Sequence, residues 1–101
     1  MDFSNKTVII TGAGNGIGKG IALLYAEKGA NVVIADIDSI AGSQTVARIK
    51  EHGGEALFVQ TDVRLESDII RLMEIANQTY GHIDILINNA GLSAFKSPYD
   101  L

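Results

Sequence analysis

The stretch that decides the fold is TVIITGAGNGIG, residues 7–18, where an apolar run leads directly into a loop with four glycines. The Val- and Ile-rich run predicts a buried β-strand. Glycine lacks a Cβ, so it adopts positive φ angles and lets backbone come close to a ligand. The loop therefore predicts either a tight strand-to-helix turn or a place where backbone contacts a ligand.

Three more apolar runs follow this first strand, at residues 31–35, 56–60 and 84–87. They are continuous rather than alternating, which is typical of strands covered on both faces. Stretches of helical length separate the strands, at residues 17–28, 40–52 and 66–80. This βαβαβαβ order predicts one α/β domain over residues 1–101, built on a Rossmann-like parallel sheet with right-handed crossovers.

Two details of the helices follow from their residue patterns. In the first helix Ile17, Ile21 and Leu24 share one stripe, which we expect to face the sheet. Ser39 precedes the second helix and is the expected N-cap.

The composition excludes several classes of protein. The chain contains no cysteine, so disulfide frameworks and thiolate metal sites are excluded. A net charge of −4 argues against nucleic acid or an anionic membrane as a partner. No apolar run approaches the roughly 20 residues of a membrane helix, and the first residues do not resemble a secretory signal. We therefore expect a cytoplasmic location.

The glycine loop lies where parallel sheets bind ligands, at the carboxyl end of a strand and the start of a helix. The helix amino terminus there is a ready anion site. The strict G-x-G-x-x-G pattern fails at Ile17, and the P-loop pattern fails at Ala13 and Gly20. The pattern that fits is T-G-x-x-x-G-x-G, carried by Thr11, Gly12, Gly16 and Gly18. With this signature the chain resembles the short-chain dehydrogenase/reductase family.

An acidic residue supports a dinucleotide as the ligand. Asp36 ends the second strand 18 positions after Gly18, near the spacing at which a carboxylate accepts from a ribose hydroxyl. The same carboxylate would repel a 2′-phosphate, and the following residues Ile37 and Asp38 supply no cation. The sequence therefore favours NAD over NADP. The alternative is an ordinary solvated acid at the end of a strand.

Two later motifs complete the resemblance. Asp62-Val63, after the third strand, resembles the family's adenine-binding element, although a loop aspartate is also ordinary there. Asn88-Asn89-Ala90-Gly91, after the fourth strand, is similar to the family's N-N-A-G motif, in which Asn88 is the more structural residue. The resemblance implies a cofactor site made of Gly12, Asn15, Gly16, Ile17, Gly18, Asp36, Ile37, Asp62, Val63, Asn89, Ala90 and Gly91.

The family's catalytic acid is not found in these residues. The resemblance implies a tyrosine with a lysine four positions later, together with a serine and often an asparagine. Tyr25 is followed four positions later by Gly29, Tyr80 by Asp84, and Tyr99 stands two residues before the end. We therefore assign no catalytic and no metal-binding residue. We expect this chain to be the cofactor-binding portion of the doubly wound fold, inactive by itself.

The implied whole protein is an NAD-dependent oxidoreductase that moves hydride between nicotinamide and an alcohol or ketone. One alternative is a nucleotide-binding or interaction module without catalysis. A more remote alternative is an S-adenosylmethionine-dependent methyltransferase, because residues 12–16 also spell G-x-G-x-G. Such enzymes usually place an acid just before the glycines, where this chain has Ile10 and Thr11.

The last predicted strand bears on assembly. Ile85, Leu86 and Ile87 are consecutive, so both faces of that strand are apolar, and its outer edge is expected to be open. An open apolar edge favours pairing with another chain. We therefore expect a homo-oligomer, or else a fragment whose remainder covers this edge.

Overall fold

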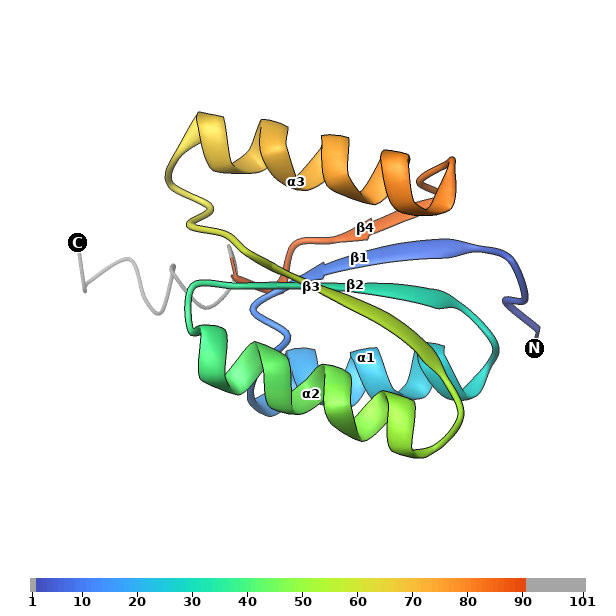
Figure 1. Cartoon of the computed structure of the whole chain (residues 1–101). Coiled ribbons are helices and arrows are strands. Elements are labelled where there is room, and N and C mark those ends of the chain that lie inside the picture. Colours follow the sequence, from blue (N-terminus) through green and yellow to red (C-terminus); the bar gives the residue numbers. More distant parts are fainter. Residues whose placement is uncertain (1, 91–101) are drawn as a thin grey trace.

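A computed structural model describes residues 2–90 and confirms the predicted α/β fold. The elements in chain order are β1 (Thr7–Thr11), α1 (Gly16–Glu27), β2 (Asn31–Asp36), α2 (Ser39–Glu51), β3 (Glu55–Gln60), α3 (Glu66–Tyr80) and β4 (Ile85–Ile87). All strand pairs are parallel, and the strands lie in the order β3-β2-β1-β4 (Figure 1). The glycine loop therefore follows a strand in the middle of the sheet.

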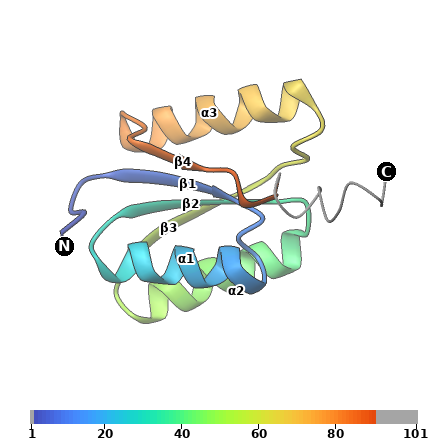
Figure 2. The same ribbon diagram turned by 180° about the vertical axis from the view of Figure 1, so that it is seen from behind.

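The sheet is the middle of three layers, with α1 and α2 on one face and α3 on the other (Figures 1 and 2). Alternate residues of β1 point to opposite faces. Val8 and Ile10 belong to the apolar cluster that includes residues of α1 and α2, while Ile9 packs with Leu72 and Ala76 of α3. All three β1 residues are fully buried, so continuous apolar runs are what this arrangement requires.

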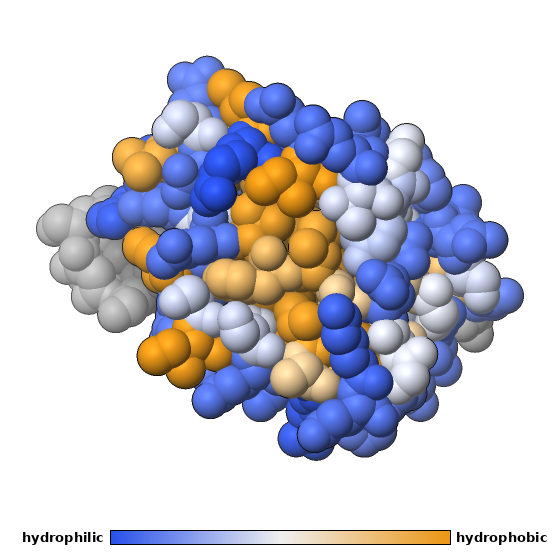
Figure 3. Space-filling view, viewed as in Figure 1, coloured by the Kyte–Doolittle hydropathy of each residue, from blue (hydrophilic) through white to orange (hydrophobic). Residues whose placement is uncertain are grey.

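The two edge strands differ from this buried centre. Within residues 2–90, β4 pairs only with β1, and its residue Leu86 is 52% exposed. At the other edge, Leu57 and Phe58 of β3 are half-buried. Figure 3 shows apolar residues gathered between α3 and α2, where β3 crosses the front of the molecule. The described part of the chain therefore has an apolar margin at each side of its sheet.

The predicted N-cap of α2 is wrong by one residue. Asp38, not Ser39, is the N-cap, and its Oδ1 accepts hydrogen bonds from the backbone N–H groups of Ile40 and Ala41, each at 3.0 Å. A carboxylate accepts more strongly than a hydroxyl and also complements the positive end of the helix dipole. The helix therefore begins at Ser39, directly after its aspartate cap.

Only the middle residue of the predicted stripe of α1, Ile21, packs against the buried core. Ile17 is 78% exposed and Leu24 is 54% exposed, whereas the buried residues of the helix are Gly18 and Ala22. The helix lies close to the glycine loop, and this close approach leaves room only for small residues at the contact. Steric fit therefore overrides the apolar pattern here.

Candidate functional site

The glycine loop connects β1 to α1 and is tied to both neighbouring strands by Gly12. The backbone N–H of Gly12 donates to the carbonyl oxygen of Ala35 in β2, at 2.7 Å. Its carbonyl oxygen accepts from Nδ2 of Asn89, just after β4, at 3.2 Å. With φ of +67°, Gly12 makes the sharp turn that both contacts require. The loop is therefore held by three strand ends.

Thr11 adds a second connection between the first and fourth strands. Its hydroxyl accepts from the backbone N–H of Ala90 at 3.0 Å and donates to Oδ1 of Asn88 at 3.1 Å. The T-G signature and the N-N-A-G motif, 77 or more residues apart, thus form one hydrogen-bonded unit.

Two of the glycines are required by packing. A Cβ on Gly18 would lie 2.3 Å from the carbonyl oxygen of Gly12 and 2.5 Å from Nδ2 of Asn89. A Cβ on Gly14 would lie 2.8 Å from both the Cβ of Ala41 and Oδ2 of Asp36. Gly16 differs, because nothing lies within 4 Å of its Cβ position. The loop is thus a tight turn on its inner side and open on its outer side.

Asp36 is oriented by two backbone donors. Its Oδ2 accepts from the N–H of Gly14 at 2.8 Å, and its Oδ1 accepts from the N–H of Asp38 at 2.9 Å. An ionised carboxylate offers about four acceptor positions. Each oxygen of this half-buried group therefore keeps capacity for a further donor, such as a hydroxyl.

Thr45, a buried threonine that no sequence motif predicted, contacts the backbone of the glycine loop. The Oγ1 of Thr45, in the middle of α2, lies 3.3 Å from the carbonyl oxygen of Gly14 and 3.2 Å from that of Ala41. Thr45 is fully buried. The only signal in the sequence is a polar residue on the buried side of an amphipathic helix.

Much of the predicted site surrounds a single hollow at the carboxyl edge of the sheet. Its volume is about 440 Å³, and its lining residues are Gly12, Asn15, Gly16, Ile17, Asp36, Asn89 and Ala90. The amino terminus of α1 opens here, and its N-cap Asn15 makes no side-chain capping bond. Uncapped N–H groups at a helix start attract anions. The hollow therefore combines an anion site with a hydroxyl acceptor and an amide.

The remaining predicted residues lie elsewhere. Gly18 packs beneath the loop, and Ile37 is 57% exposed beyond β2, where its carbonyl oxygen accepts from Nε2 of Gln60 at 3.2 Å. Asp62 and Val63 follow β3 and are half-buried. Gly91 lies outside the described residues.

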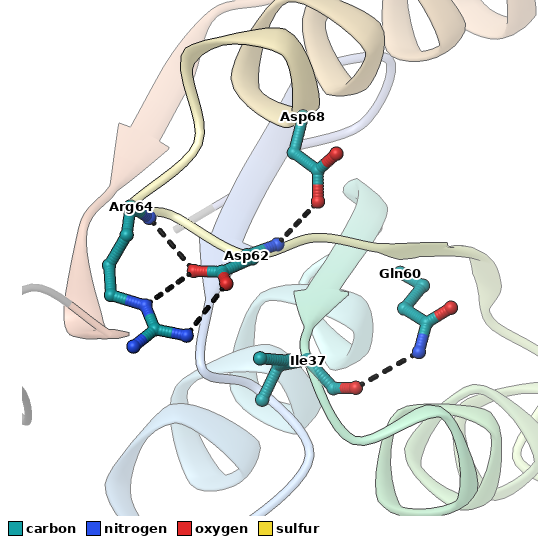
Figure 4. A network of polar contacts seen from close by, with 5 residues as sticks. All are labelled: Ile37, Gln60, Asp62, Arg64 and Asp68. Atoms are coloured by element: carbon teal, nitrogen blue, oxygen red, sulfur yellow. Dashed lines mark hydrogen bonds and ion pairs between the residues drawn. The ribbon is translucent and has the colours of Figure 1, made fainter.

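The segment around Asp62 follows β3, which lies beside β2, so it is at the same carboxyl end of the sheet as the glycine loop. The backbone N–H of Thr61 donates to the carbonyl oxygen of Asp36 at 3.0 Å, and that of Asp62 donates to Oδ2 of Asp68 in α3 at 2.9 Å. Figure 4 shows this segment between the end of β2 and the start of α3. It therefore extends the row of strand ends that begins with the glycine loop.

Asp62 forms an ion pair with Arg64 that the sequence analysis also missed (Figure 4). Nε of Arg64 donates to Oδ1 at 2.9 Å, and Nη2 donates to Oδ2 at 2.8 Å. These side-chain bonds, followed by a 3.0 Å bond from the Arg64 N–H, lower the pKa of Asp62 to about 2. The available signal was the spacing of two residues, which is typical of an aspartate turn.

Other features of the described chain lie away from this edge. A larger hollow, of about 580 Å³, lies between the carboxyl-terminal ends of α1 and α2 and contains no predicted site residue. Residues 2–90 include no cluster of three His, Asp or Glu side chains placed to hold a metal. None of their helices is both long and apolar enough to cross a membrane.

The sheet and the residues at its carboxyl end define the class of protein. A parallel sheet with a glycine-rich turn after β1 and a carboxylate at the end of β2 is the dinucleotide-binding Rossmann arrangement. Residues 6–101 match the short chain dehydrogenase family, and the chain belongs to that family. Family membership leaves the methyltransferase interpretation without support.

Relatives agree with this assignment. The chain is 47% identical over 92 residues to an uncharacterized oxidoreductase of Thermotoga maritima, covering 91% of this chain and 36% of the relative. It is 43% identical over 101 residues to 7alpha-hydroxysteroid dehydrogenase of Escherichia coli, covering 100% of this chain and 39% of that enzyme. The chain thus spans less than two-fifths of the length of these curated relatives.

Solved structures show the same fold. A hydroxysteroid dehydrogenase from Escherichia coli superposes with a TM-score of 0.85 at 40% identity, over 86% of this chain and 37% of that one. A 7 alpha-hydroxysteroid dehydrogenase complexed with NADH and 7-oxo glycochenodeoxycholic acid superposes with a TM-score of 0.82 at 40% identity, over 84% and 33% of the two chains.

Proposed function

We propose that this protein is an NAD-dependent oxidoreductase that transfers hydride between nicotinamide and an alcohol or ketone. Residues 1–101 supply the cradle for the cofactor. The observation that carries the proposal is the 440 Å³ hollow, because most of the predicted cofactor residues line it. NADH in the solved structure of a steroid-acting relative supports the choice of ligand.

The pyrophosphate is assigned to the amino terminus of α1. The backbone of Asn15, Gly16 and Ile17 lines the hollow there, and the helix dipole favours an anion at this end. Because the space beside Gly16 is empty to 4 Å, phosphate oxygens can approach the backbone closely. The open outer side of the loop is therefore suited to binding a phosphate group.

The adenosine ribose is assigned to Asp36. Its two carboxylate oxygens are held by Gly14 and Asp38 and retain acceptor capacity for two hydroxyl groups. A 2′-phosphate would meet this negative charge without a neighbouring cation at residues 37 and 38. The preferred cofactor is therefore NAD.

The adenine is assigned to Asp62 and Val63, one strand end further along. The family resemblance gives the carboxylate of Asp62 to the exocyclic amine and the backbone of Val63 to the ring. On the opposite side of the hollow, Asn89 and Ala90, with Gly91, are assigned to the rest of the dinucleotide. The cofactor then crosses the strand ends from β3 to β4.

No residue of this chain is assigned to proton transfer. Hydride transfer to a ketone needs an acid for the developing alkoxide, and residues 1–101 contain no Y-x-x-x-K motif. We therefore propose that these residues alone bind cofactor without turnover. The second candidate is a nucleotide-binding module without catalysis.

A charge placed in the phosphate site tests the proposal. Gly16→Asp adds a carboxylate at the start of α1, and Gly53→Asp is its matched control. Both glycines have positive φ, of +58° and +81°, and nothing lies within 4 Å of either Cβ position. Gly53 lies just before β3, at the end of the sheet opposite the glycine loop. NADH binding is measured by calorimetric titration.

We expect the parent chain and Gly53→Asp to bind NADH, and Gly16→Asp to lose most of that affinity. Equal binding by the two variants would overturn the assignment of the pyrophosphate. Binding without turnover of any alcohol or ketone by the complete natural protein would favour the non-catalytic module.

A further inference from the structure

We propose that Arg64 is a positioning residue that prepares Asp62 for one hydrogen bond from the amino group of adenine. This inference rests on the proposed function, from which it takes the adenine contact of Asp62. It adds a residue that neither the family signature nor the hollow includes. The geometry of the ion pair between Arg64 and Asp62 supports this role (Figure 4).

The acceptor positions of Asp62 are nearly all occupied. Oδ1 accepts from both Nε and the backbone N–H of Arg64, and Oδ2 accepts from Nη2. An ionised carboxylate has about four acceptor positions, so about one remains, and it is on Oδ2. The exocyclic amine of adenine would use one N–H on such an acceptor. The ion pair therefore leaves about one acceptor position on Oδ2, which matches a single hydrogen-bond donor.

The backbone beneath this carboxylate is already fixed. The N–H of Asp62 is bound by Asp68 at 2.9 Å, and the N–H of Thr61 is bound by the carbonyl oxygen of Asp36 at 3.0 Å. Rotation of the Asp62 side chain is the main freedom that remains. The two-pronged contact from Arg64 removes it, because a guanidinium fork matches a carboxylate in one plane.

The two side chains of the ion pair differ in their exposure to solvent. The side chain of Arg64 is 77% exposed, while that of Asp62 is only 17% exposed. The guanidinium thus lies toward solvent and the carboxylate is sheltered. The fork therefore acts on the orientation of the carboxylate and not on its charge, because an aspartate is ionised near neutral pH with or without Arg64. An anionic, oriented acceptor binds a donor better than a rotating one.

The experiment compares NADH with reduced nicotinamide hypoxanthine dinucleotide, in which an oxo group replaces the 6-amino group. Dissociation constants for both are measured with the parent chain, Arg64→Met, Arg64→Lys and the control Arg48→Met. Arg48 is an exposed arginine of α2 at the opposite edge of the sheet, so its variant matches the change in net charge. Differences in the Val63 contact between the ligands are common to all four proteins and cancel.

We expect the parent chain and Arg48→Met to prefer NADH by about tenfold, the effect of one hydrogen bond to a charged acceptor. Arg64→Met should lose most of this preference by weakening NADH while leaving the hypoxanthine analogue unchanged. Arg64→Lys should fall between them, because an ammonium restores the charge but not the fork.

An unchanged preference in Arg64→Met would overturn the inference. Tighter NADH binding by that variant would also overturn it, because Arg64 would then be blocking the base. If the parent chain binds neither dinucleotide, the proposed function fails first and this inference fails with it. If Arg64→Met binds NADH with the same preference as the parent chain, this inference fails but the proposed function is still supported.

Discussion

Asp36 and Gly14 are joined by a 2.8 Å hydrogen bond from the backbone N–H of the glycine to the aspartate carboxylate, across 22 residues of sequence. The side chain expected to bind the ribose therefore also shapes the loop expected to bind the phosphates. Under the proposed assignment, selection of the cofactor and the structure of the loop are coupled through this one contact.

This coupling makes Asp36→Ala an informative substitution. We expect NADH binding to weaken by about 1.5–3 kcal/mol, since hydrogen bonds to a charged group are lost. NADPH should gain only partly, because the variant relieves repulsion but also frees the N–H of Gly14. Asp36→Asn, which keeps an acceptor without the charge, is the control. An unchanged ratio of NADH to NADPH affinity in Asp36→Ala would contradict the assignment.

The contact between α1 and the loop predicts opposite effects for two glycines of one helix. Gly18→Ala should destabilise the fold by about 1–3 kcal/mol, because its Cβ would overlap the Gly12 carbonyl oxygen. Gly20→Ala meets nothing within 4 Å and should stabilise the helix by about 0.5–1 kcal/mol. Urea unfolding of both variants measures the difference, and equal stabilities would refute the packing argument.

Thr45 should matter for the loop although it does not line the hollow. Thr45→Val keeps the shape but removes the hydroxyl whose single proton is shared between the carbonyl oxygens of Gly14 and Ala41, at a cost of about 1–3 kcal/mol. The control is Thr79→Val in α3, an exposed threonine that also bonds the carbonyl four residues earlier. Its effect should stay within about 0.5 kcal/mol. Similar losses in both variants would show that the contact with Gly14 contributes nothing.

The ion pair at Asp62 predicts an acid titration. Its pKa lies at about 2 in the folded chain, against 3.8 for an unperturbed aspartate. Because the folded pKa is the lower one, the stabilisation is complete above about pH 4 and is lost as pH falls from 3.8 toward 2. NMR titration of the carboxyl carbon should show this midpoint, and Arg64→Met should raise it. A parent midpoint near 3.8 would exclude the pair in solution.

The outer edge of β4 predicts self-association. We expect the chain to sediment as a homo-oligomer, because Leu86 is half exposed on a strand with one described neighbour. Leu86→Lys should shift the population toward monomer, whereas Leu24→Lys, at a similarly exposed position on α1, should not. A parent chain that is a single monomeric species would rule out this edge as an interface.

The sequence predicts the fold well because a four-stranded parallel sheet needs strands that are apolar on both faces. The runs around Ile9 and Val33 carry that requirement in their composition alone. The cap of α2 was predicted one residue too late because Asp38 and Ser39 are both good caps, and only backbone geometry decides between them.

The site was predicted less completely. The residues that line the hollow follow from motifs, because motifs record where backbone must turn or come close. Thr45 and Arg64 belong to no motif, and their roles depend on which atoms the fold brings within 3.3 Å. Ile17 lines the hollow as predicted, but it does not belong to a buried stripe of α1, because apolar periodicity does not show that Gly18 has to face the loop.

The bond between Asn89 and the Gly12 carbonyl has a consequence for biosynthesis. A ribosome makes the glycine loop early, but the amide that holds it is added 77 residues later. A nascent chain that stops short of Asn89 therefore carries a loop fastened on one side only. A dinucleotide bound at this loop, as proposed above, would stabilise the domain only after the fourth strand has joined the sheet.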